Sequence, residues 1–189
     1  MENFYDQTFD KVDLKTNPLQ KGEYESCTFK NCDLSEADLA DTRFIECTFI
    51  NCNLSLAKFK KTSFQDAKFK DCKMLGLRFE HCEPFNLSLG FDNCQLNHSS
   101  FYQVKLKKTA FKNCQLQESD FTESDLSGAI LDNCDIARST FENTILERAD
   151  LRTAYNYSID PESNRIKKAR FSLQGLPGLL GKYDIEIEM

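Results

Sequence analysis

A four-residue motif returns along most of the 189-residue chain at nearly constant intervals. The motif NCDL at residues 31–34 reappears, with substitutions, at residues 51, 71, 93, 113 and 133. These copies are 20 residues apart, except for one interval of 22 between residues 71 and 93. Inside each interval a large apolar residue recurs at every fifth position, as at Phe29, Leu34 and Leu39. Fixed internal periods of this kind are typical of a solenoid, in which repeats stack around one continuous core.

A step of five residues fits neither an amphipathic helix, whose apolar residues are three and four apart, nor an alternating strand. It predicts a chain that turns a corner every five residues, and the 20-residue return predicts four sides per coil. The large residue at the centre of each five, and the small residue two positions before it, should point inward. We therefore expect an all-β solenoid, with asparagines such as Asn31 and Asn51 stacked at one corner.

The pattern divides the chain into two parts. Residues 1–155 carry the repeats, and two extra residues near 84–90 account for the interval of 22, so we expect a bulged corner or small loop there. Residues 156–189 begin with a polar, proline-containing connection and end in an apolar segment. For this part we expect a C-terminal cap, made of a short helix after Pro177 and a strand from Tyr183.

The nine cysteines obey the same five-residue rule. Each stands two residues before a central position, in a slot that alanine, serine or threonine fills elsewhere. We therefore expect buried thiols. Pairs such as Cys27 and Cys32 are too widely spaced for the usual zinc loop, and their thiols should enter from adjacent sides. Stacked cysteines should hold their β-carbons farther apart than a disulfide prefers.

Catalytic signals are weak. The two histidines, His81 and His98, stand outside any nucleophile motif, and the chain has no glycine-rich phosphate loop. We expect no enzyme activity, no metal site and no cofactor. The formal charge of -6 argues against direct binding to nucleic acid or to anionic membranes. The chain has no apolar leader and no run that could cross a bilayer, so a cytoplasmic protein is expected.

Acidic residues gather late in the repeats, where residues 117–150 carry nine acids against two arginines. We expect a partner-binding surface there, with side chains pointing outward, and the alternative is a solvated exterior that only keeps the rod soluble. The expected surface consists of Glu118, Asp120, Glu123, Asp125, Asp135 and Asp150.

Several of the fives spell a known motif. ADL at residues 37–39 and 149–151, and SDL at residues 124–126, resemble the A(D/N)LXX repeat of the pentapeptide-repeat proteins. The resemblance covers about four fifths of the chain and implies a right-handed quadrilateral β-helix. Residues 179–187 also resemble the C-terminal segment through which the Qnr-type quinolone-resistance members dimerise. The alternative is a cap that folds back without dimerising. The implied homodimer contacts are Leu176, Leu179, Leu180, Tyr183, Ile185 and Ile187.

The Qnr-type resemblance implies a function without catalysis. Those proteins mimic B-DNA and bind type II topoisomerases in its place, so DNA gyrase or topoisomerase IV is the implied partner and protection from quinolones the implied effect. The rival hypothesis is a scaffold or adaptor for another protein, which would use the bulge at Pro84 or a basic patch. The basic patch would consist of Lys58, Lys60, Lys61, Lys68, Lys70 and Lys73.

Overall fold

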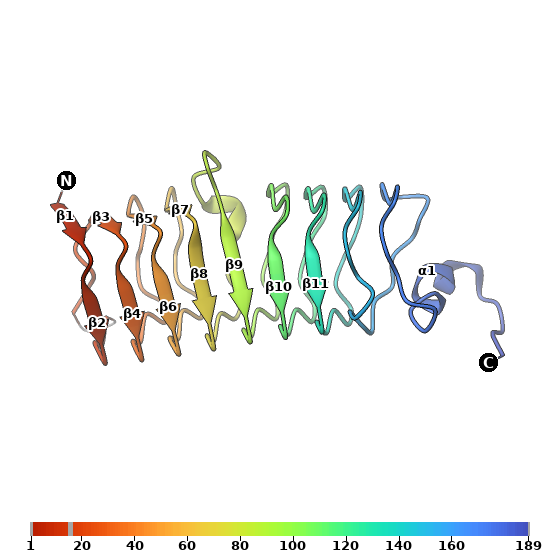
Figure 1. Ribbon diagram of the computed structural model, residues 1–189, viewed down its shortest axis with the longest axis horizontal. Helices are drawn as coiled ribbons and strands as arrows, with labels where there is room; N and C mark the ends of the chain where they lie inside the picture. The colour runs from red at the N-terminus through yellow and green to blue at the C-terminus, as the bar shows by residue number, and fades with distance from the viewer. Residues whose placement is uncertain (1, 15–16, 189) are drawn as a thin grey trace.

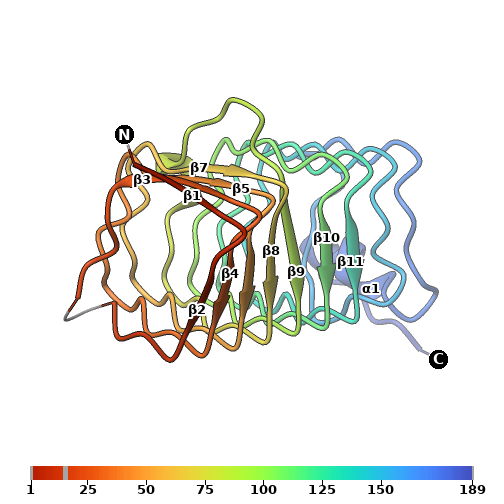
Figure 2. The ribbon, with the colours of Figure 1, turned by 60° about the vertical axis from the view of Figure 1, so that its left-hand side comes forward.

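The chain forms a rod of stacked coils with its two ends at opposite extremes (Figures 1 and 2). The computed structural model describes residues 2–14 and 17–188. All strand pairings in this part of the chain are parallel, and each joins one coil to the next. Phe29, for example, pairs with Phe49, which lies 20 residues later. The predicted all-β solenoid is confirmed.

Two of the four sides are regular sheets, and sides are numbered here in chain order. Side 1 is a four-stranded sheet, and side 2 is a seven-stranded sheet. Side 1 contains β1 (Glu2–Tyr5), β3 (Gly22–Glu25), β5 (Arg43–Ile45) and β7 (Ser63–Gln65). Side 2 contains β2 (Thr8–Asp10), β4 (Thr28–Lys30), β6 (Thr48–Ile50), β8 (Ala67–Lys70), β9 (Leu89–Asp92), β10 (Ala110–Lys112) and β11 (Ile130–Asp132).

Sides 3 and 4 are held by single bridges between coils. On side 3, Asp33 pairs with Asn53; on side 4, Ser100 pairs with Asp120. Beyond β7, side 1 continues in the same manner through Lys105 and Asp125. Each residue therefore belongs to a side that is fixed by its place in the 20-residue period.

The two extra residues form a loop. Phe69 pairs with Phe91, so the register of side 2 resumes unchanged after the insertion. The chain leaves side 4 through a 3-10 helix, η1 (Phe79–His81), and then runs outward in a loop whose Phe85 is 70% exposed. Figure 1 shows this loop, in yellow-green, projecting beyond the other corners.

The core consists of columns of stacked side chains, as the inward positions predict. The ring centroids of Phe101 and Phe121 are 4.9 Å apart at 2°, and Phe141 continues the column 5.1 Å further on. Columns on neighbouring sides meet edge to face, as Phe101 and Phe111 do at 87°. Offset and edge-to-face contacts are the arrangements that aromatic rings prefer. The column is therefore stabilised both along and across the rod.

The small inward residues are also hydrogen-bond donors. Thr62 Oγ1 donates to the carbonyl of Leu39 at 2.8 Å, and Thr144 Oγ1 donates to that of Phe121 at 2.8 Å. The thiols make the same contact at longer distance, as Cys52 Sγ does with the carbonyl of Phe29 at 3.4 Å. All nine cysteines are buried and free.

The corners use left-handed backbone at non-glycine residues, with φ near +50° to +60°. Asn31, Asn51, Asn113 and Asn133 occupy one such corner. Their side chains form the predicted ladder, with Asn51 Nδ2 donating to Asn31 Oδ1 at 2.8 Å. Asparagine tolerates this conformation better than most residues and gains a coil-to-coil hydrogen bond there.

The C-terminal segment differs in part from its prediction. The helix after Pro177 is present as α1 (Pro177–Leu180), and a 3-10 helix, η2 (Gly181–Tyr183), follows it directly. The strand predicted from Tyr183 is wrong, because residues 184–188 form no bridge. An alternating sequence becomes a strand only beside a partner strand, and within this single chain none lies next to it. In the described part of the chain, no helix has the length and apolar character that crossing a membrane requires.

We predict that Phe121→Ser lowers the free energy of unfolding by at least about 3 kcal/mol. The substitution removes a fully buried ring from the middle of a column and places a hydroxyl in the space that it leaves. Urea unfolding followed by circular dichroism measures the loss. The exposed Glu142→Gln is the control and should change the stability by less than about 0.5 kcal/mol. Equal stability of the two variants would contradict the assigned core.

Candidate functional site

The acidic residues that precede a central position are partly buried and hydrogen-bonded to the backbone. Asp120, Asp125, Asp135 and Asp150 each accept a hydrogen bond from the N–H group two residues later, at 2.9, 3.0, 3.2 and 3.2 Å. Such side-chain turns stabilise the local backbone. The expectation that these carboxylates only point outward is therefore incomplete, because each one also helps to hold its own turn.

The structure does not bring the six predicted acids onto one surface. Asp125 lies on side 1, Asp150 on side 2, Asp135 on side 3 and Asp120 on side 4. Glu118 and Glu123 lie at the two corners that flank side 4. The reason is geometric: a step of five residues turns the chain onto the next side, so only residues about 20 apart share a face.

Basic neighbours neutralise several of these acids. Lys107 Nζ lies 3.2 Å from the Asp125 carboxylate. Glu118 pairs with Arg138 and lies 3.2 Å from His98 Nδ1. By contrast, Asp135 accepts hydrogen bonds from the neutral amides of Gln117 and Asn156. A count of charges along the sequence therefore overstates the negative charge that a partner would meet.

Asp150 is held between two arginines. Arg152 donates to both of its carboxylate oxygens, and Arg170 Nη1 lies 3.2 Å from Oδ2. The hydrogen bonds from Arg152 hold the pKa of the Asp150 carboxyl below its ordinary value. Partial burial acts to raise the pKa of Asp125, but hydrogen bonds from Ser127 and Lys107 outweigh it, so that pKa is also lowered. Both groups stay ionised at neutral pH.

In the C-terminal half of the rod, three acids on or beside side 4 have no ion pair within the described residues. These are Asp120, Glu123 and Glu142, and we call them the acidic face. Glu123 accepts a hydrogen bond from the neutral amide of Gln103 at 2.7 Å. Glu142 is exposed on the coil above, and its carbonyl accepts the N–H of Glu123. Glu142 was absent from the predicted site, although the 20-residue period stacks it directly above Thr122, between Asp120 and Glu123.

The predicted basic patch is divided too. Lys58 lies on side 4, where its backbone forms a bridge with that of Asp38. Lys60 follows on the same side, and Lys61 lies at the next corner. Lys68 and Lys70 lie in β8 on side 2, and Lys73 lies on side 3. Side 4 therefore carries both lysines and acids, among them Asp38 and Asp41, in its N-terminal half and mostly acids in its C-terminal half.

The six predicted dimer contacts have different environments. Leu179 packs against the core, so it belongs to the cap itself. Leu180 is half-buried. The exposed members are Leu176 (41%), Tyr183 (50%), Ile185 (55%) and Ile187 (46%). Leu176, Leu180 and Ile187 line an apolar groove at the end of the rod, together with Leu173 and Pro177.

Polar contacts, which the sequence did not predict, fasten the cap to the last coil. Lys182 Nζ lies 2.8 Å from Asp160 and 2.6 Å from Glu162. The Tyr183 hydroxyl donates to Glu162 at 2.9 Å, and the Ile159 N–H donates to the Gly178 carbonyl at 2.8 Å. The hydrogen bonds to Asp160 and Glu162 raise the pKa of the Lys182 ammonium, which remains charged.

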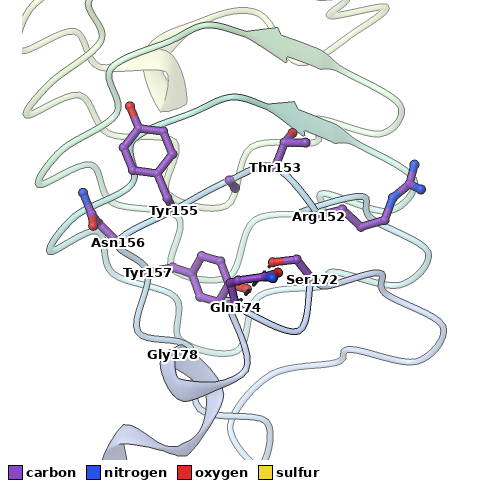
Figure 3. Close-up of a pocket in the computed structure, with 10 residues that line it drawn as sticks. Arg152, Thr153, Tyr155, Asn156, Tyr157, Ser172, Gln174 and Gly178 are labelled. Carbon is purple, nitrogen blue, oxygen red and sulfur yellow. Dashed lines mark hydrogen bonds between the residues drawn. The ribbon is translucent and has the colours of Figure 1, made fainter. Parts of the chain in front are cut away.

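A polar cavity of about 540 Å³ lies between the last coil and the cap (Figure 3). Residues 152–157 form one wall, and Ser172, Gln174, Gly175 and Gly178 form the other. Figure 3 shows Tyr157 between the two walls, with Tyr155 and Asn156 on the coil beside it.

The nine thiols are buried, so solvent and substrates do not reach them. Burial raises the pKa of Cys47 to about 12, and it also raises the pKa of Cys82, so these groups are protonated at neutral pH. A reactive cysteine needs a lowered pKa and access to solvent. In residues 2–14 and 17–188, no three metal-binding side chains lie close enough together to hold an ion.

Comparison with known proteins identifies the repeat. The family model described as pentapeptide repeat region matches residues 22–87, 42–121 and 78–151, which overlap and together cover most of the chain. The chain belongs to the pentapeptide-repeat family. No curated protein matches it in sequence.

Solved pentapeptide-repeat structures have the same fold. A trypsin-treated variant of QnrB1, a plasmid-mediated fluoroquinolone resistance protein, is similar with a TM-score of 0.50 and 20% identity over 98% of this chain and 97% of the other. HetL from the cyanobacterium Nostoc, involved in the regulation of heterocyst differentiation, is similar with a TM-score of 0.50 and 18% identity over 92% and 85%. At this identity the likeness concerns the fold alone.

We predict that Asp125→Ala destabilises the protein by about 1 kcal/mol and Asp125→Asn by less. Asparagine keeps the oxygen that accepts the Ser127 N–H, whereas alanine removes it. Because the folded-state pKa of Asp125 is lowered, the ionised carboxylate contributes stability above the unfolded pKa of about 3.9. That contribution is lost as the pH falls through the folded value. Thermal unfolding of the three proteins between pH 2 and pH 7 measures both effects, and identical curves for alanine and asparagine would exclude the turn.

Proposed function

We propose that this pentapeptide-repeat protein acts by binding another protein, and that its partner is a bacterial type II topoisomerase, DNA gyrase or topoisomerase IV. The observation that carries the proposal is the acidic face on one side of a narrow rod. The fold that the chain shares with QnrB1, a fluoroquinolone resistance protein, supports the same choice of partner. The partner acts in the cytoplasm, so the protein is proposed to reside there.

The acidic face is suited to a surface that normally holds DNA. Asp120 and Glu123 lie on one coil, and Glu142 lies on the next. Carboxylates without an ion pair on two successive coils would attract the basic groove that receives the double helix. Such attraction increases the association rate and weakens with salt.

The apolar groove at the end of the rod is proposed to join two copies. Exposed apolar side chains at the open end of a solenoid must be covered by a cap or a partner. Leu179 already caps the last coil, whereas Leu176 and Ile187 stay exposed at the groove. A two-fold dimer through this end would match the two-fold symmetry of a topoisomerase. Residues 184–188 would then gain the neighbouring backbone that a strand needs.

One observation favours the rival function, a scaffold for a different protein. The N-terminal half of side 4 carries Lys58, Lys60 and Lys61, and the adjacent loop exposes Phe85. A basic surface beside a single exposed aromatic residue suits an acidic partner with an apolar pocket. Charge reversal of Lys60 and Lys61 would then weaken binding more than changes in the acidic face.

We predict that the triple variant Asp120→Asn, Glu123→Gln and Glu142→Gln inhibits gyrase supercoiling at least tenfold less strongly than the wild type. The substitutions remove three charges from the acidic face and keep the side-chain oxygen of residue 120 that accepts the Thr122 N–H. Supercoiling inhibition and protection from ciprofloxacin are measured with gyrase and topoisomerase IV from the same host. Raising the salt concentration should reduce the wild-type effect and leave the residual effect of the variant nearly unchanged.

The matched control removes the same number of charges elsewhere. The variant Glu25→Gln, Asp33→Asn and Glu46→Gln changes sides 1 and 3 and one corner, all in the N-terminal half of the rod. Its residue 33 likewise keeps the oxygen that accepts the Ser35 N–H. It should inhibit within twofold of the wild type. If the wild type neither inhibits nor protects at micromolar concentration, the topoisomerase proposal fails.

We predict that the wild type sediments as a dimer and that Leu176→Asp with Ile187→Asp sediments as a monomer. Both residues line the apolar groove, where a carboxylate would be desolvated in the interface. The matched control, Ile45→Asp, changes a half-buried residue of β5 on side 1, in the N-terminal half of the rod, and should remain a dimer. A monomeric wild type over a hundredfold concentration range would leave the C-terminal segment as a cap alone.

A further inference from the structure

The C-terminal half of side 1 carries a concentration of positive charge that neither the acidic face nor the apolar groove uses. Three residues per coil lie on the outer surface of this side and its following corner, namely 105, 107 and 108 and the residues 20, 40 and 60 positions later. We call these twelve residues the basic strip. Seven of them are lysine or arginine and two are acidic, which gives the strip a formal charge of +5. The whole chain, by contrast, has a formal charge of -6.

The two acids of the strip are already paired within it. Lys107 Nζ lies 3.2 Å from the Asp125 carboxylate, and Arg165 Nη2 lies 2.7 Å from that of Glu147. The other five cations are exposed and form no ion pair within the described residues. These five are Lys105, Lys108, Arg148, Lys167 and Lys168.

The columns that flank the strip do not cancel its charge. On side 2 the adjacent column ends in Asp150 and Arg170, whose charges balance, and its members from residue 110 to residue 130 are apolar. At the opposite edge, the corner between sides 4 and 1 holds one acid, Glu123, beside the neutral amides of Gln103 and Asn143. A partner that approaches side 1 here therefore meets net positive charge.

The strip is short and bounded. In the N-terminal half of side 1, the equivalent outward positions hold five acids and one arginine. The projecting loop separates the two halves, since it leaves side 1 at Glu83 and rejoins it at Ser88. Three steps between coils, each about 4.8 Å, make the strip roughly 14 Å long, which is about the length of five extended residues. A nucleic acid lying along the rod would continue onto the acids, whereas a short peptide segment would not.

A largely apolar cleft opens where the strip meets the loop. It has a volume of about 200 Å³ and lies between Pro84 and Leu87 of the loop and Val104 and Lys105 of the next coil. Lys105 belongs to both the cleft and the strip. The acid in the cleft wall, Glu80, is in an ion pair with an arginine of its own coil. The cleft therefore suits one apolar side chain next to a positively charged surface.

We propose that the basic strip and this cleft bind a short, extended, acidic segment of another protein. Carboxylates of the segment pair with the five cations that have no ion pair, and one apolar side chain of the segment enters the cleft. Complementary charge fixes the orientation and increases the association rate, and the apolar contact adds affinity. The surface lies on a different side from the acidic face, so the inference does not rest on the topoisomerase proposal.

The probe is a seven-residue peptide with blocked ends, in which five alternating aspartates and glutamates stand between two leucines. A leucine then reaches the cleft in either chain direction. We expect a dissociation constant below about 100 μM in calorimetry at low salt, and binding at least about tenfold weaker at 0.5 M salt because the charges are screened. A peptide with asparagine and glutamine in place of the acids should bind at least about tenfold more weakly. Alanine in place of both leucines should weaken binding about fivefold.

A triple variant tests the strip at its corner column. Glutamine fits the left-handed backbone of these corners, as Gln103 shows, so the variant should unfold at the wild-type temperature. Its affinity for the acidic peptide should fall at least about tenfold. The three substitutions are Lys108→Gln, Arg148→Gln and Lys168→Gln.

The matched control removes three exposed cations that lie outside the strip, and it should bind the peptide within twofold of the wild type. Its substitutions are Lys11→Gln, Lys30→Gln and Lys70→Gln. The variant Leu87→Ala tests the cleft, because it removes an apolar wall. With this variant the leucine and alanine peptides should differ by less than twofold, since the contact that distinguishes them is gone.

Four results would overturn the proposal. They are no binding of the acidic peptide at millimolar concentration in low salt, equal affinity for the acidic and amide peptides, equal loss of affinity in the strip variant and its control, and tighter binding of a single-stranded DNA with five phosphates. The last result would assign the strip to nucleic acid. The third would show that the peptide responds only to the net charge of the protein.

Discussion

Every coil of this protein must place its residues directly above those of the coil before it. Backbone hydrogen bonds from coil to coil, such as that from the Asn31 N–H to the Ile50 carbonyl at 3.0 Å, require this superposition. The corners make it possible by adopting left-handed backbone at residue after residue, which costs roughly 1 kcal/mol or more each. The stacked core and the side-chain ladders offset that cost. The fold is therefore stable only as a continuous stack. The last coil has no neighbour on one side, so a cap or a partner must cover it.

The core could be predicted from the sequence because burial and period coincide. An inward position recurs every five residues and its column every 20, so Phe121 could be assigned to the interior from spacing alone. The outer surface could not be predicted in the same way, because a window of sequence runs around all four sides. Asp120 and Asp125 are neighbours in the chain but lie on different faces. Assigning each acid to its position within the 20-residue period would have grouped Glu142 with Asp120 and Glu123.

The end of the chain was predictable only where local rules act. Pro177 favours the first turn of a helix, and α1 begins there. The strand beyond Tyr183 depends on a partner strand, which no local rule supplies. Lys182 contacts Asp160 and Glu162, which lie about 20 residues earlier in the chain. These contacts form only because the cap docks on the last coil, and no local rule predicts that docking. The cavity between the last coil and the cap depends on the same docking, so it had no signal in the sequence.

The arrangement of charge along side 4 bears on how a dimer would behave. The acidic half lies near the apolar end, whereas Lys58, Lys60 and Lys61 lie toward the N-terminus. Joining two copies through their C-terminal ends would bring both acidic halves to the centre and place both lysine-bearing halves outward. Like charges at the centre repel each other, and salt screens this repulsion over about 8–10 Å. A cationic groove would relieve the repulsion by binding both halves at once. Dimerisation and binding to such a groove would therefore favour each other, whereas a flat neutral partner would gain nothing from the pairing.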